Sequence, residues 1–429
     1  MLSLIALVTV LFCVVLLMSG RVSPVVTLIL IPLAAALFAG FPVGEIKGFI
    51  AKGIMTLAPV VALFICAILF FSIMHKQGLF NPLVDRLLAL AGNSPTRIMM
   101  ISVLVTALTH LDGAGATTYL ITITALLPVY QRLGINVLHL TLLTGCTAGI
   151  MNLVPWTGPV LRASSVVNID PVLLWKPLLP VQLAGIGCCL VMAWWLGQRY
   201  RRPELTGPRS HTAVTENTVT ASPRWRYWSN ALLTTVLVIV LLTSGLPGLL
   251  VFMVALALAL VINFSDARTQ LQCIRENAGE ALLLATILFS AAVFLGILSH
   301  SGMLDQVTRQ AIALLPETLS RYLYLIVGVL ALPLGMMFGA DPWYFGIMPV
   351  VTAIGEAHGI APESVARAMM LGENVGFSIS PMVGSAWLLS SLSGVSLGQH
   401  IRYSLPAIWA VALLMLGIAI TTGAVELPG

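Results

Sequence analysis

Long apolar stretches, many of them close to 20 residues, recur along the whole chain between short polar or glycine- and proline-containing segments. About 20 consecutive apolar residues are what an α-helix needs to cross the hydrocarbon core of a bilayer. The pattern therefore predicts an all-α polytopic membrane protein. The apolar runs fall near 2–19, 25–42, 54–74, 98–111, 116–130, 137–160, 176–197, 229–245, 246–263, 277–299, 322–339, 343–355, 366–392 and 403–422.

Two pairs of these runs are too short for each member to cross by itself, and only a short break joins the two members. Irregular backbone at membrane depth is tolerated where protein or a cavity surrounds it. Each pair therefore predicts a re-entrant hairpin that enters and leaves on one side. The hairpins cover about 98–130 and about 322–355.

Two other apolar runs, about 137–160 and about 366–392, contain proline and glycine in their interiors. The interruptions lie at Asn152–Gly158 and Gly372–Gly384. Discontinuous helices of this kind form substrate and ion sites in many secondary transporters. We expect one broken helix in each half of the chain.

The sequences on the two sides of a polar central segment resemble each other. Gly78 and Gly302 lie 224 positions apart, and Asp112 and Asp341 lie 229 apart. Matched Gly, Pro and Asp in a constant order are not explained by shared apolar composition. The predicted division is a first repeat over 1–197, a linker over 198–228 and a second repeat over 229–429.

Each repeat is predicted to cross the membrane five times, because a hairpin does not cross. Two tandem copies of an odd number of spans must have opposite orientations, which predicts an inverted repeat. Basic residues are more frequent at the span ends that share a side with the linker. By the positive-inside rule, we expect a cytoplasmic linker.

Composition excludes a soluble enzyme. Charged residues make up 9% of the chain, against roughly 25% in soluble domains, and the mean hydropathy is +1.01. The net charge of +5 accords with the positive-inside bias and does not indicate a nucleic-acid partner. Motifs typical of metalloproteases (HExxH), thiol redox proteins (CxxC) and nucleotide-binding proteins (a phosphate-binding Gly-Lys loop) do not occur in the sequence. We therefore expect neither an enzyme nor a tightly bound cofactor.

Three acidic residues lie inside the apolar segments. Asp112 and Asp341 fall at the two hairpin tips, and Glu373 falls at the second broken helix. A charge at membrane depth costs at least about 2.5 kcal/mol, so such residues are functional candidates. They could bind Mg²⁺ or Ca²⁺ together with the substrate, or carry a proton. The alternative for the two aspartates is a purely structural role as helix N-caps.

Other residues near the tips and breaks could bind an anion. Helix N-termini carry unpaired N–H groups, and glycines let a ligand approach the backbone. Arg162 could pair with a substrate carboxylate or with one of the acids, or its side chain could extend to the interface. The candidate substrate-binding residues are Asp112, Gly113, Gly115, Thr117, Thr118, Asn152, Pro155, Gly158, Arg162, Gly339, Asp341, Glu373, Asn374 and Ser380.

These motifs resemble the citrate-metal-proton symporter family of the ion transporter superfamily, which is similar in fold to the divalent anion:sodium symporters. The resemblance covers nearly the whole chain. Its most specific parts are Leu111-Asp112-Gly113 through Tyr119, Gly149-Ile150-Met151-Asn152 through Pro159, Arg162-Ala163, Gly339-Ala340-Asp341-Pro342 with Tyr344-Phe345-Gly346, Ser380-Pro381 and Gly394-Val395.

The resemblance implies transport of citrate, complexed with a divalent cation, together with protons across the bacterial inner membrane. It also implies a homodimer in which hairpins and broken helices form a mobile transport domain. The early spans of each half would form a scaffold, and transport would follow an elevator motion.

Two positions depart from the family pattern. Ala114 stands where the family usually has a second acid, and Glu373 stands where it tends to have glutamine. The match therefore supports a di- or tricarboxylate transporter more firmly than a metal-citrate transporter. The alternative is a metal-free carboxylate:proton symporter or exchanger.

Overall fold

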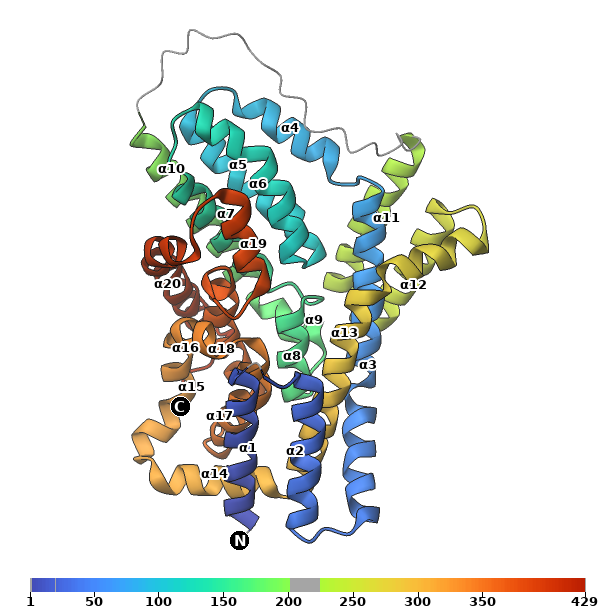
Figure 1. Ribbon diagram of the computed structural model, residues 1–429, viewed down its shortest axis with the longest axis vertical. Coiled ribbons are helices and arrows are strands. Elements are labelled where there is room, and N and C mark those ends of the chain that lie inside the picture. The colour runs from blue at the N-terminus through green and yellow to red at the C-terminus, as the bar shows by residue number, and fades with distance from the viewer. Residues whose placement is uncertain (1, 20, 201–223, 429) are drawn as a thin grey trace.

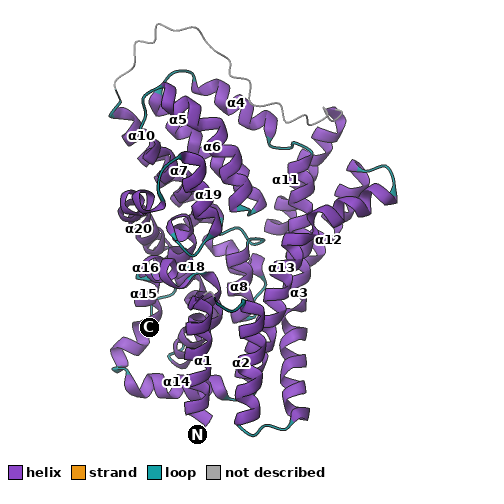
Figure 2. Ribbon diagram, in the orientation of Figure 1, coloured by secondary structure: helices purple, strands orange, loops and turns teal. Residues whose placement is uncertain are grey.

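The computed structural model describes residues 2–19, 21–200 and 224–428, and these ranges contain helices and no strand (Figures 1 and 2). Most of the predicted linker therefore lies outside the described residues. In the first part of the chain the helices are α1 (Leu2–Ser19), α2 (Pro24–Phe38), α3 (Val43–Lys76), α4 (Asn81–Ala91), α5 (Pro95–Thr109), α6 (Gly115–Arg132), α7 (Val137–Met151), α8 (Gly158–Val167), α9 (Pro171–Trp175) and α10 (Leu179–Gln198).

The second part continues the all-helical architecture. Its helices are α11 (Arg224–Thr243), α12 (Gly248–Asn263), α13 (Ala267–His300), α14 (Met303–Leu314), α15 (Glu317–Val329), α16 (Ala331–Phe338), α17 (Met348–Ala357), α18 (Pro362–Gly376), α19 (Gly384–Ser393) and α20 (Leu397–Thr421). Short 3₁₀ segments cover His110–Asp112, Lys176–Leu178 and Phe377–Ile379, and a π-helical stretch covers Pro342–Ile347.

Many of the described helices are long and apolar enough to cross a membrane. Seven segments of the described chain meet this test, and a bent pair raises the number to up to eight. Three shorter apolar helices, α2, α7 and α12, occupy further predicted spans. The chain is therefore a multi-pass membrane protein, as its hydropathy predicts. The seven segments are Leu2–Ser19, Val43–Lys76, Pro171–Gln198, Arg224–Thr243, Ala281–His300, Pro362–Ser393 and Leu397–Thr421.

Both predicted hairpin regions fold as two helical arms around a turn. In the first, α5 and α6 pack against each other around a turn at 110–114. In the second, α15 packs against α17, and the turn lies at Gly339, where φ is +77°. The two predicted broken helices correspond to α7 with α8 and to α18 with α19. The division of the chain into repeats and a cytoplasmic linker remains a prediction.

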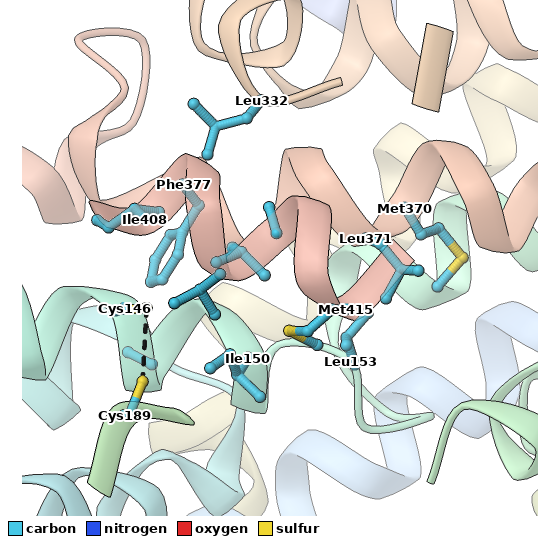
Figure 3. Close-up of a cluster of buried hydrophobic side chains, with 14 of the residues drawn as sticks. Cys146, Ile150, Leu153, Cys189, Leu332, Met370, Leu371, Phe377, Ile408 and Met415 are labelled. Carbon is cyan, nitrogen blue, oxygen red and sulfur yellow. Dashed lines mark hydrogen bonds between the residues drawn. The ribbon is translucent and has the colours of Figure 1, made fainter. Parts of the chain in front are cut away.

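The buried apolar side chains form two large clusters. One joins α5–α10 to α15–α20 and contains Cys146, Cys189, Phe377 and Met415 (Figure 3). The other joins α1–α3 to α11–α13 and also takes in Trp156 from the first break. Each cluster therefore contains residues from both halves of the chain. The helices of the hairpins and the broken helices contribute mainly to the first cluster.

The longest helices, α3 and α13, lie side by side and belong to the second cluster (Figure 1). Each has 34 residues, and both their first and last residues are 224 positions apart. Asp266 caps α13 by accepting a hydrogen bond from the Thr269 amide at 2.9 Å. The matched lengths and spacing are the strongest structural sign of the predicted repeat.

Gly149 allows the two broken helices to touch. A methyl group built on Gly149 would lie 2.6 Å from the Val375 carbonyl oxygen and 2.7 Å from that of Asn374. Because both are backbone atoms, the Gly149→Ala variant is expected to lose about 1–3 kcal/mol of stability. Thermal unfolding in detergent checks this, with Gly417→Ala as the control, since nothing lies within 4 Å of that site. Equal melting temperatures for the two variants would contradict the close approach.

Candidate functional site

The first hairpin tip holds Asp112 in a tight turn. The turn is possible because Gly113 has a φ of +75°. One carboxylate oxygen of Asp112 accepts a hydrogen bond from the Ala114 amide at 2.9 Å, and the other accepts one from the Thr117 hydroxyl at 2.8 Å. Asp112 therefore closes the turn that precedes α6, whose N-cap residue is Ala114. Each carboxylate oxygen has two lone pairs and can accept more than one bond.

His110 ties this tip to the first break. The ring is fully buried, with one nitrogen 2.8 Å from the Thr118 hydroxyl and the other 2.9 Å from the Asn152 side-chain oxygen. The Trp156 indole donates to the Leu111 carbonyl at 2.8 Å. Tip and break thus form one hydrogen-bonded unit.

A cavity of about 260 Å³ lies between this unit and the long helices α3 and α13. Asp112 and Thr117 contribute polar groups, while Trp156 is stacked on Phe71 of α3 at 4.8 Å between ring centroids. The cavity is large enough for a small polycarboxylate, and its large apolar lining residues, Phe64, Ile68, Trp156 and Leu284, belong to the second apolar cluster. Its lining residues are Phe64, Ile68, Ser72, His75, Lys76, Asp112, Gly113, Ala114, Thr117, Trp156, Thr157, Gly158, Asn277 and Leu284.

Arg162 connects the two halves of the site. Its Nε donates to Asp341 Oδ1 at 2.8 Å, and the two side chains are only 11% and 18% exposed. A narrow crevice next to the cavity is lined by Arg162 and Gly158, and the cavity wall shares Gly158. Of the roles left open by the sequence, this structure has Arg162 paired with a site acid.

Glu373 is enclosed beside this pair. The Tyr344 hydroxyl donates to its carboxylate at 2.6 Å, and the Asn374 amide donates to Tyr344 at 3.3 Å. Glu373 is 6% exposed and interacts electrostatically with both Arg162 and Asp341. A side chain in place of Gly335 would collide with it, since a methyl group there would lie 2.7 Å from its Cγ.

The remaining candidates hold tips and breaks together. Ser380 donates to the Met336 carbonyl at 3.0 Å, which joins the second break to α16. Gly115 faces Phe377 and Ser385, so the first tip touches the second break. Pro155 and Gly158 lie in and directly after the turn that follows α7. The structure therefore gathers both tips and both breaks in one region.

Comparison with protein-family models identifies the family of the chain. The model of the citrate transporter (CitMHS) family matches residues 13–372. The chain belongs to this family. It is 35% identical over 414 residues to a Bacillus subtilis (strain 168) protein named citrate transporter, which covers 94% of this chain and 96% of that protein. The Mg(2+)/citrate complex secondary transporter of the same organism is 32% identical over 422 residues and covers 96% of both chains.

Two solved structures share the fold of this citrate transporter family member. The Alcanivorax borkumensis YdaH transporter matches 87% of this chain and 88% of its own, with a TM-score of 0.59 and 16% identity. Neisseria gonorrhoeae MtrF matches 87% of this chain and 82% of its own, with a TM-score of 0.62 and 16% identity. The predicted all-α polytopic fold is confirmed, whereas the inverted repeat remains a prediction. Membership in the citrate transporter family identifies the chain as a transporter rather than an enzyme.

The acids of this family member do not form a protein-only metal cage. Among the described residues, no three His, Cys, Asp or Glu side chains come together in a group that could hold a metal ion. Asp112 lines the cavity, whereas Asp341 and Glu373 lie with Arg162 and Tyr344. A divalent cation bound at Asp112 would have to draw its other oxygen ligands from substrate and water.

Three side chains that complete the site were not among the candidates. His110, Trp156 and Tyr344 all contact a candidate residue or its backbone. Each lies within the sequence segments that carry the family resemblance or next to one. Their partners are distant in sequence or on another helix, so the spacing of residues along the chain does not predict these contacts.

Proposed function

We propose that this chain is a secondary active transporter that carries citrate, as a complex with a divalent cation such as Mg²⁺, together with protons. The observation that carries the proposal is the cavity at Asp112, formed where a hairpin tip meets a broken helix. Membership in the citrate transporter family and the two named Bacillus relatives support the substrate class.

Citrate and cation are proposed to bind as one unit at the tip. Asp112 supplies a hard oxygen to the cation, and the Thr117 hydroxyl and the start of α6 face the same cavity. Arg162, at the adjoining crevice, supplies positive charge for a carboxylate. Asp341 accepts a hydrogen bond from Arg162 in this structure. A substrate carboxylate would therefore share the Arg162 guanidinium with Asp341 or replace Asp341 as its partner.

We propose an elevator motion between the two apolar clusters. The cluster of α5–α10 and α15–α20 carries the tips and breaks, and the cluster of α1–α3 and α11–α13 forms the scaffold. The cavity lies between the first tip and break and the scaffold helices α3 and α13, where a sliding movement would change its exposure. A homodimer in the bacterial inner membrane with a cytoplasmic linker completes the proposal.

Uptake of labelled citrate into proteoliposomes tests the function. We expect uptake that requires Mg²⁺ or another divalent cation and is driven by an inward proton gradient. The absence of citrate uptake in all conditions would refute citrate transport. Undiminished uptake in a chelator would instead favour the metal-free carboxylate:proton symporter, a candidate supported by Ala114 and by the lack of a three-ligand acidic group among the described residues.

Glu373 is proposed to carry the coupled proton. It is buried, it accepts from Tyr344, and it lies beside the charged pair of Arg162 and Asp341. Glutamine keeps the acceptor for Tyr344 but binds no proton. The Glu373→Gln variant is therefore expected to lose roughly tenfold or more of gradient-driven uptake while retaining citrate exchange.

Gradient-driven uptake and gradient-free exchange are measured on the same proteoliposomes. Glu356→Gln is the matched control, because Glu356 is an exposed acid on α17. Normal gradient-driven uptake by Glu373→Gln would remove Glu373 from proton coupling and leave it a structural role.

A further inference from the structure

The mouth of the cavity is lined by polar and basic side chains of the two long helices. Ser72, His75 and Lys76 come from the last turns of α3, and Asn277 comes from the early part of α13. We call these four residues the vestibule. None of them belongs to a tip or a break, so they form a part of the cavity that the proposed citrate site does not use.

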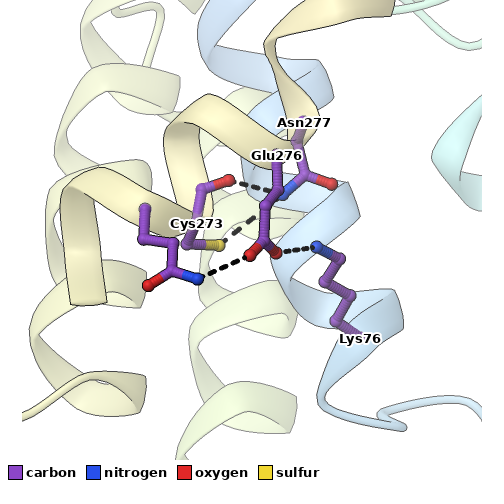
Figure 4. Close-up of polar contacts among 5 residues, drawn as sticks. Lys76, Cys273, Glu276 and Asn277 are labelled. Atoms are coloured by element: carbon purple, nitrogen blue, oxygen red, sulfur yellow. Dashed lines mark hydrogen bonds and ion pairs between the residues drawn. The ribbon is translucent and has the colours of Figure 1, made fainter.

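Lys76 is bound by an acid on the neighbouring helix. Its Nζ lies 2.9 Å from Glu276 Oε2, and Gln272 donates to the other oxygen of Glu276 at 3.1 Å (Figure 4). The hydrogen bond from Lys76 lowers the pKa of the Glu276 carboxyl below its usual range. Glu276 is therefore negatively charged at neutral pH and largely balances the charge of Lys76.

The pair is open to solvent and can exchange partners. Lys76 and Glu276 side chains are 44% and 50% exposed, and exposed pairs of this kind are weak. An ammonium group has three N–H donors, so Lys76 can bind a second carboxylate without first leaving Glu276. Asn277 is held nearby by a hydrogen bond from its amide to the Cys273 carbonyl at 2.6 Å (Figure 4).

The opposite end of the same helix pair is built differently. By the 224-residue offset, Ser72 corresponds to Gly296, and Asn277 corresponds to Gly53. Gly53 and Gly296 pack so closely that a methyl group on Gly296 would lie 2.6 Å from the Phe49 carbonyl oxygen and 3.1 Å from the Gly53 Cα. Where the helices touch at one end, they line a cavity at the other.

The charges at matched positions also differ. Lys76 corresponds to His300 and Glu276 corresponds to Lys52 under the same offset. The tightly packed end thus has two basic residues and no matched acid, whereas the vestibule end has one lysine and one glutamate. Glu276 does not line the cavity, but its pairing with Lys76 distinguishes this end of the helix pair electrostatically.

We propose that the vestibule is a second anion-binding site, on the linker side of the proposed citrate site, which holds a polycarboxylate by Lys76 as it enters or leaves the cavity. Glu276 competes with the substrate for Lys76 and so weakens this hold, which favours release. The inference rests on the proposed citrate transport, but it assigns no role to Asp112, Asp341 or Glu373.

The test compares citrate KM on the two faces of the membrane. Right-side-out cells present the outer face, and everted vesicles present the face that the linker is predicted to share. In everted vesicles, Glu276→Gln is expected to lower KM roughly two- to fivefold, and Lys76→Met to raise it by a similar factor. In cells, KM should stay at the wild-type value for both variants. In everted vesicles, the Lys76→Arg variant should have a KM close to that of the wild type.

Asp85→Asn is the control, because Asp85 is an exposed acid on α4 outside the cavity lining. The KM differences should also shrink at high ionic strength, since the pair is exposed. Unchanged KM in both variants, or changes confined to cells, would overturn the vestibule proposal while wild-type citrate transport stands. Absence of citrate transport by the wild-type protein would instead refute the proposed function itself.

Discussion

The Asp341→Asn variant is expected to lose roughly a hundredfold or more of citrate uptake. Asp341 accepts a hydrogen bond from Arg162 at 2.8 Å in a pair that is 11% and 18% exposed. Removing one partner of a partly buried pair leaves an uncompensated charge, which costs up to about 3–5 kcal/mol. The pair joins α8 to the second hairpin, so its loss should disturb the site where the two halves meet. Initial uptake rates in proteoliposomes check this.

A double variant separates the effect of losing the Asp341 charge from the effect of destabilising the fold. Combining Asp341→Asn with Arg162→Gln removes both charges, so more folded protein should be recovered than with Asp341→Asn alone, whereas uptake should stay low. Asp305→Asn on α14 is the control, since Asp305 is exposed. Wild-type uptake by Asp341→Asn would exclude Asp341 from the site.

The Asp112→Asn variant is expected to lose a similar fraction of uptake, and the remaining uptake should no longer respond to Mg²⁺. The substitution is informative because asparagine can still accept from the Ala114 amide, which Asp112 does at 2.9 Å. The turn before α6 should therefore survive while the negative charge at the cavity is lost. Asparagine oxygen is a weaker ligand for a divalent cation than a carboxylate.

Uptake is measured against Mg²⁺ concentration for Asp112→Asn and for the wild type. Thermal unfolding of the same preparations should give nearly equal melting temperatures, because the turn is preserved. A lower melting temperature together with an unchanged Mg²⁺ response would return Asp112 to a purely structural role in the turn before α6.

Sequence pattern predicted the helices well because local composition determines them. The first hairpin was predicted over about 98–130, and α5 and α6 cover 95–132 with the turn between them. Apolar run length indicates membrane helices, and glycine or proline within a run indicates a turn or break. Helix α11 begins at Arg224, inside the predicted linker range, because an arginine- and tryptophan-rich helix start carries little hydropathy signal.

Contacts across the two halves could not be predicted in the same way. The sequence left Arg162 open between substrate and a site acid, and only the fold brings it to Asp341, 179 positions away. The sequence also suggests that the three acids could share one cation site. In the structure, Glu373 accepts a hydrogen bond from Tyr344, and Asp112 accepts one from Thr117 at the first tip. Packing between helices decides these partners, and residue spacing does not encode it.

The sharing of each apolar cluster between both halves bears on how the chain is made. When the ribosome has completed the first 197 residues, α1–α3 lack α11–α13 and α5–α10 lack α15–α20, so neither cluster is complete. Polypeptides generally fold unit by unit as they emerge, but here no unit closes before the second half is inserted. In the nascent first half, the helix faces that later pack against the second half therefore contact lipid or insertion factors until synthesis ends.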